Sequence, residues 1–65
     1  MKEMNLRNED ISHANLSDAD MSRIALQGAG LAGSVLSGAN LRDANLYGVN
    51  LCGANLCGAK IGNEI

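Results

Sequence analysis

The chain has 65 residues, a formal net charge of −2 and only five basic side chains. This length predicts one domain spanning residues 1–65, and the few basic side chains exclude a basic nucleic-acid-binding patch. No apolar run reaches the length of a signal peptide or a membrane span. We therefore expect a cytoplasmic protein with neither nucleic-acid nor membrane partners.

A large aliphatic residue recurs every five positions along the chain. On an α-helix, five residues advance a side chain by about 140° beyond a full turn, so these residues would spiral over every face. In a straight strand, residues five apart point to opposite faces. The pattern therefore predicts a solenoid that bends once in every block. The recurring residues are Leu6, Ile11, Leu16, Met21, Leu26, Leu31, Leu36, Leu41, Leu46, Leu51, Leu56 and Ile61.

Each five-residue block predicts two inward and two outward side chains. The leucine and the small residue two positions before it share one face of a short extended segment, and the residues beside the leucine face outward. The fifth position is mostly Gly, Asn or Asp, which tolerate turn dihedrals, so we place the bend there, at every fifth residue from 8 to 63. The predicted core contains Leu26, Leu31, Leu36, Leu41, Leu46, Leu51 and Leu56.

The clearest blocks lie at residues 39–58, ANLRDANLYGVNLCGANLCG, where a small residue, Asn, Leu and two variable positions follow one another. This motif resembles the pentapeptide-repeat family. The resemblance implies an all-β fold, a right-handed quadrilateral β-helix with four blocks in each coil. Repeats from about residue 4 to 63 would then form about three coils.

The first coil, roughly residues 4–23, is the least regular. Glu9 occupies an inward position where burying a carboxylate is costly, and we expect it to turn to solvent or to cap open backbone amides. Met4 and Ile24 lie twenty residues apart, so we expect them to stack above Ala44.

Acidic residues collect in this first coil. The main interpretation is a solvated end that discourages aggregation. The alternative is an imitation of DNA phosphates, because some members of the resembled family are thought to occupy the DNA-binding groove of DNA gyrase. Those members are longer, strongly acidic, often have phenylalanine in the core and dimerise through a C-terminal element, and this chain lacks these features. The acidic residues are Glu9, Asp10, Asp18 and Asp20.

The second coil, residues 24–42, loses the usual Asn of the motif. Ala25, Gly30 and Val35 replace it and, with Ala32, make adjoining outer walls small and partly apolar. The main interpretation is drift of the repeat, and the alternative is a flat contact surface for a partner.

Two charged residues and one aromatic residue complete the outer walls. Arg23 and Asp43 share the bend position twenty residues apart, so we expect them to lie side by side as an exposed pair. Tyr47 is the only aromatic residue and is expected above Gln27 and Arg7 on one wall. Because tyrosine often anchors interfaces, Tyr47 is a candidate contact residue, with Gln27, Ala32 and Val35 as its companions.

The sequence offers no chemistry-bearing cluster. Cys52 and Cys57 occupy outward positions in successive blocks, with a bend between them, and we expect two free thiols in a reducing compartment. The one histidine, His13, lies two coils away, so we expect no metal site, no cofactor and no catalytic nucleophile with its base.

These observations favour a non-enzymatic structural or protein-interaction module. The short rigid β-helix would bind an unidentified protein partner or associate with itself through its coil ends, which expose backbone donors and acceptors. The alternative function is a DNA-mimicking modulator of DNA gyrase or a topoisomerase, of the quinolone-resistance type.

Overall fold

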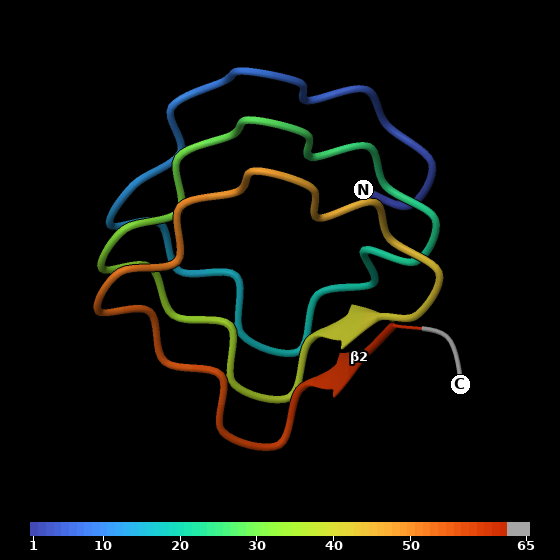
Figure 1. The fold of residues 1–65 in the computed structure, drawn as a ribbon. Coiled ribbons are helices and arrows are strands. Elements are labelled where there is room, and N and C mark those ends of the chain that lie inside the picture. Colours follow the sequence, from blue (N-terminus) through green and yellow to red (C-terminus); the bar gives the residue numbers. More distant parts are fainter. Residues whose placement is uncertain (63–65) are drawn as a thin grey trace.

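The computed structural model describes residues 1–62 and shows a β-helix whose coils stack along one axis (Figure 1). The two strands are β1 (Asn40–Leu41) and β2 (Lys60–Ile61), which pair in parallel with Asn40 opposite Lys60. All bridged residues are twenty apart, so one coil contains four blocks. The isolated parallel bridges are Asn5 to Ala25, Asp10 to Gly30, Asn15 to Val35, Asp20 to Asn40, Ala25 to Asn45, Gly30 to Asn50 and Val35 to Asn55.

The strand pieces are very short because each block spends two of its five residues in a turn. The coils are nevertheless joined at regular intervals. Leu26 N–H donates to the carbonyl of Asn45 over 3.0 Å, and Gly28 N–H donates to that of Tyr47 over 3.0 Å. In the opposite direction, Asn45 N–H donates to the carbonyl of Ile24 over 3.0 Å. Backbone hydrogen bonds thus hold the stack without a continuous sheet around the coil.

The bends fall at the fifth position of each block, which confirms that part of the prediction for residues 8–58. The backbone there has positive φ, from 57° at Arg23 to 74° at Gly58. The N–H of the following residue donates to the carbonyl of the leucine three positions before it, as from Ala29 to Leu26 over 2.9 Å. A positive φ at the third residue is characteristic of a type II β-turn. The bend predicted at Asn63, with the end of the repeat range, lies outside the described residues.

The turn pattern of the repeat includes residues 1–3, ahead of the start that the sequence predicts near residue 4. Met4 N–H donates to the carbonyl of Met1 over 3.2 Å, and Glu3 N–H donates to that of Ser22 over 3.0 Å. Glu3 also has the positive φ of a bend, 63°. Met1 takes the leucine position twenty residues before Met21. The motif is not recognisable here, because residues 1–3 hold only the leucine, variable and bend positions of a block.

The core is centred on the middle coil, since only this coil has a neighbour on each side. Leu46, Leu51 and Leu56 pack against this core but remain partly exposed. In the stack of Met4 over Ile24 over Ala44, Met4 is 47% exposed and Ile24 only 1%. The fully enclosed apolar residues are Met21, Ile24, Leu26, Ala29, Leu31, Leu36, Ala39 and Leu41.

One polar residue is buried among these aliphatic side chains. Ser34 occupies an inward small-residue position and is 0% exposed. Its hydroxyl donates to the carbonyl of Leu31 over 2.7 Å, so its hydrogen-bonding capacity is used inside the coil.

Residues 1–62 contain no helix long and apolar enough to cross a membrane.

Candidate interaction surfaces

The outer walls are built from columns, by which we mean sets of residues twenty positions apart that lie above one another in successive coils. Tyr47 shares a column with Gln27 and Arg7 and is 83% exposed. Gln27 is partly buried, and its Oε1 atom is shielded from solvent without a hydrogen-bond partner among the described residues. This column therefore combines an exposed aromatic ring with an unpaired amide oxygen.

The other two candidate contact residues lie in different columns. Val35 is bridged to Asn15 and Asn55, and Ala32 precedes Gly33, whose N–H donates to the carbonyl of Cys52. Both Val35 and Ala32 are partly buried. The structure therefore does not gather the predicted contact residues into one patch with Tyr47.

The Asn or Asp before each leucine has a structural task that the sequence pattern alone did not reveal. Its Oδ1 atom accepts a hydrogen bond from the backbone N–H two residues later, as from Tyr47 to Asn45 over 3.1 Å and from Cys52 to Asn50 over 3.0 Å. This local bond is an Asx turn. It recurs along the first and third coils and at one place of the middle coil: Asn5, Asp10, Asn15 and Asp20 in the first, Asn40 in the middle, and Asn45, Asn50 and Asn55 in the third.

The middle coil lacks this Asx turn on three sides, where Ala25, Gly30 and Val35 stand in place of Asn. The corresponding amides, of Gln27, Ala32 and Ser37, donate to no other described residue. The substitutions thus remove a specific hydrogen bond. The sequence could have predicted the Asx turn, because the motif places Asn two positions before the first turn residue.

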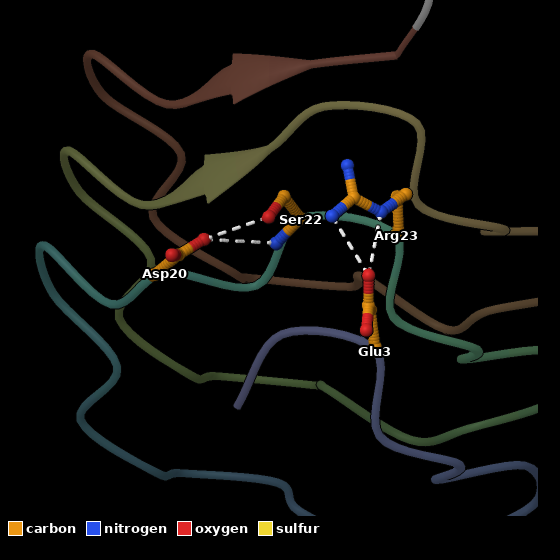
Figure 2. Close-up of polar contacts among 4 residues, drawn as sticks. All are labelled: Glu3, Asp20, Ser22 and Arg23. Carbon is orange, nitrogen blue, oxygen red and sulfur yellow. Dashed lines mark hydrogen bonds and ion pairs between the residues drawn. The ribbon is translucent and has the colours of Figure 1, made fainter.

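The ion pair in the bend column of residues 3, 23 and 43 differs from the prediction. Arg23 contacts Glu3, not Asp43: its guanidinium lies 2.7 Å from the Glu3 carboxylate, and Nε donates to the same oxygen over 2.8 Å (Figure 2). The structure extends the repeat to Met1, which places Glu3 in the corner column above Arg23. Both partners are more than half exposed, so the pair contributes little stability.

Two carboxylates of the first coil accept hydrogen bonds from serine. The Asp20 carboxylate accepts from the hydroxyl of Ser22 over 2.8 Å and from its N–H over 3.2 Å (Figure 2). Asp10 and Ser12 repeat this arrangement. The hydroxyl bond, followed by the backbone bond, lowers the pKa of each carboxyl below its ordinary value of 3.8.

The thiols and the histidine are not brought together. Cys52 and Cys57 are free and exposed on the third coil, whereas the ring of His13 lies over Gly33 from the first coil. Within residues 1–62, no three His, Cys, Asp or Glu side chains gather where they could hold a metal ion. Glu9 is exposed at its inward position in the first coil, in line with the expectation that it turns to solvent.

The two ends of the stack present open backbone groups. At the third-coil end, by which we mean the free edge of residues 44–59, the amides of Gly48, Leu51, Gly53, Leu56 and Gly58 donate to no described residue. Their counterparts in the middle coil all donate to the third coil, as Leu31 does to Asn50 over 2.8 Å. At the first-coil end, the free edge of residues 5–20, the carbonyls of Asn5, Arg7, Asp10, Ser12, Asn15 and Ser17 accept from no described residue, and the amides of Asp10, Asn15 and Asp20 donate to none.

The twenty-residue coil, the bend in every block and the inward leucines define a repeat β-helix. A family model described as pentapeptide repeats, in eight copies, matches residues 19–58, and the chain belongs to this family. It is also similar to the crystal structure of a pentapeptide repeat protein, Rfr23, from the cyanobacterium Cyanothece 51142. The two chains are 31% identical, with a TM-score of 0.82. The alignment covers 94% of this chain but 46% of that one. Comparison with curated proteins gave no match.

Proposed function

We propose that the chain is a non-enzymatic interaction module that binds a second copy of itself or an extended segment of another protein at an open coil end. The observation that supports this proposal is the third-coil end. Leu46, Leu51 and Leu56 remain partly exposed there, although Leu26, Leu31 and Leu36, in the same columns, are fully enclosed. The same edge carries the unpaired amides of Gly48 and its counterparts. An added strand or coil would satisfy both features together.

Several further features support the same proposal. Along the third-coil end, open backbone donors alternate with partly exposed apolar side chains. This pattern fits a partner segment in extended conformation that offers backbone carbonyls and apolar side chains. His13 lies in the first coil and both thiols lie in the third, so the imidazole is not placed as a base beside either thiol. This separation supports a binding role over nucleophilic catalysis. The exposed free thiols favour a reducing compartment, and the cytoplasm is our proposed location. The right-handed sense of the coil, implied by the family, is part of this proposal.

Light scattering behind size exclusion, across a concentration series, tests self-association. The variant Ala54→Glu places a carboxylate at an inward position of the third-coil end, and Asn55→Asp makes the same charge change at the neighbouring outward position. We expect the wild type and Asn55→Asp to associate and Ala54→Glu to stay monomeric while folded. A wild type that is monomeric up to about 1 mM would contradict self-association.

The gyrase hypothesis has one observation in its favour. The first coil carries exposed carboxylates at Glu3, Glu9, Asp10, Asp18 and Asp20. A supercoiling assay with DNA gyrase, with and without micromolar protein, tests it. Inhibition, or protection from a quinolone, would support DNA mimicry, and an unchanged reaction would exclude it.

A further inference from the structure

The two ends of the stack match each other in register. Sixty residues separate equivalent positions of the first coil and of an imagined fourth coil, because each coil contains twenty residues. A second copy placed head to tail would therefore present its first-coil end to the third-coil end of the first copy, with the leucine columns continuous.

The open hydrogen-bonding groups are complementary across that junction. Within the chain, Ile11 N–H donates to the carbonyl of Gly30 over 2.8 Å, nineteen residues further on. The same rule applied across the junction directs the open amides of the third coil to open carbonyls of the next copy. The pairs are Gly48 with Arg7, Leu51 with Asp10, Gly53 with Ser12, Leu56 with Asn15 and Gly58 with Ser17. In the reverse direction, the carbonyls of Val49, Ala54 and Ala59 face the amides of Asp10, Asn15 and Asp20.

The charges of the two coils also favour this junction. Residues 1–20 contain five carboxylates and two basic side chains, whereas residues 41–60 contain Arg42 and Lys60 against one carboxylate, Asp43. The acidic first coil is thus attracted to the basic third coil, and two first coils would repel each other.

One inward side chain opposes the stack. Glu9 occupies the small-residue position of its block, in one column with Ala29 and Val49, since Asp10 is bridged to Gly30 and Gly30 to Asn50. Ala29 is 0% exposed because a coil lies on each side of it. In a head-to-tail stack, Glu9 would lie between Val49 of the other copy and its own Ala29. Its charge would then lose water, with no hydrogen-bonding or charged partner among the described residues to replace it.

A second, smaller obstacle to stacking lies on the side of the junction that contains β2. Ile61 pairs with Leu41 in the β1–β2 ladder, so it occupies the column position that Met1 of an incoming copy would take. The incoming Met1, Lys2 and Glu3 would leave their places and give up the exposed contact of Glu3 with Arg23. Such a contact is weak, so this side resists stacking less than the buried carboxylate does.

We infer that Glu9 is the residue that prevents head-to-tail stacking of this chain into an open filament. An inward-pointing charge at a sheet edge is a known means of preventing edge-to-edge association. Removal of this charge leaves two complementary ends, and because head-to-tail contact does not close on itself, the assembly grows without a fixed size. The inference deepens the proposed function, because it leaves the third-coil end as the surface available in the wild type.

The variant Glu9→Ala tests this inference against the control Asp10→Asn. Both remove one negative charge, at neighbouring positions, but only the first frees the inward column. By light scattering and sedimentation velocity, we expect the mass of Glu9→Ala to rise several-fold with concentration and without a plateau. Asp10→Asn should follow the wild type. Equal masses for Glu9→Ala and the wild type, or equal growth of both variants, would overturn the inference.

A second variant tests the junction itself. Glu9→Ala combined with Ala54→Glu restores an inward carboxylate on the opposite side of the junction and should abolish the growth. Growth that persists in this folded double variant would overturn the head-to-tail geometry. The outcome is separable from the proposed function: a monomeric wild type with a stacking Glu9→Ala variant contradicts wild-type self-association but supports the role of Glu9. Thermal melting followed by circular dichroism confirms that each variant is folded.

Discussion

The imidazole of His13 covers Gly33 from the neighbouring coil, so closely that a Cβ atom on Gly33 would lie 2.7 Å from Nδ1. Gly53 occupies the next place in the same corner column, and its nearest neighbour to an added Cβ is the amide nitrogen of Gly33 at 3.8 Å. Both glycines have positive φ, 70° and 73°. The pair therefore separates backbone strain from steric crowding.

We predict that Gly53→Ala costs about 1–2 kcal/mol, the usual penalty of a side chain in this backbone region. Gly33→Ala should cost about 1 kcal/mol more, because the ring of His13 has to move. Urea denaturation of both variants measures the difference. In a His13→Ala background the two glycine substitutions should become equal, and a difference that survives would show that His13 is not its cause.

The leucine columns predict unequal losses at chemically identical positions. Leu26 is 0% exposed, whereas Leu46, in the same column, is partly exposed at the third-coil end. We expect Leu26→Ala to cost about 2–5 kcal/mol, the range for a cavity in a closed core. Leu46→Ala should cost less, and Asn45→Ala, which loses one Asx hydrogen bond, about 1 kcal/mol. Equal unfolding midpoints for Leu26→Ala and Leu46→Ala would contradict the position of the core in the middle coil.

Restoring a missing Asx turn should stabilise the middle coil. Ala25 lies in one column with Asn5 and Asn45, and both of those residues accept a backbone N–H two positions later. The variant Ala25→Asn can accept from Gln27 N–H and should gain about 0.5–1.5 kcal/mol. Ala25→Gln is the control, because its longer side chain places the amide oxygen beyond this geometry. Thermal melts that rank Ala25→Asn at or below Ala25→Gln would contradict the assignment.

The hydrogen bonds of Asp20 predict a loss of stability in acid. The hydroxyl and N–H of Ser22 lower the pKa of Asp20 below 3.8 in the folded chain. A lowered carboxyl pKa stabilises the folded state above the unfolded pKa, and this contribution disappears as the pH falls from about that value through the folded pKa. The variants Asp20→Asn and Ser22→Ala should therefore lose less stability than the wild type between neutral pH and pH about 3. Parallel curves for all three proteins would exclude this contribution.

The five-residue spacing of the large aliphatic residues predicted much of the fold. A leucine every five residues required a bend in each block, and the Gly, Asn and Asp residues located it. The coil of four blocks and its β-helix came from the family resemblance. The block at residues 1–3 could not be recognised, because these residues hold only the leucine, variable and bend positions of the motif, and the partner of Arg23 depended on that block. The task of Asn45 and its equivalents depends on a hydrogen bond that outward direction alone does not specify.

The candidate site was harder to predict for a physical reason. Tyr47, Ala32 and Val35 stood out as unusual residues on the walls, but they lie in three different columns. The third-coil end differs from the core only in its neighbours. Leu31 and Leu51 are both leucines at the same position of the motif, but a further coil covers Leu31 and none covers Leu51 among the described residues. One sequence motif repeated along the chain cannot express that difference.

Amide hydrogen exchange measured by NMR at low and high protein concentration tests whether the third-coil end binds a second copy of the chain. We predict that the amides of Gly48, Leu51 and Gly53, which donate to no described residue in the single chain, gain protection as the protein associates. The wall amides of Gln27, Ala32 and Ser37 should exchange at unchanged rates. Protection that appears at these wall amides, with none at the third-coil end, would show that the walls make the contact and that the third-coil end does not.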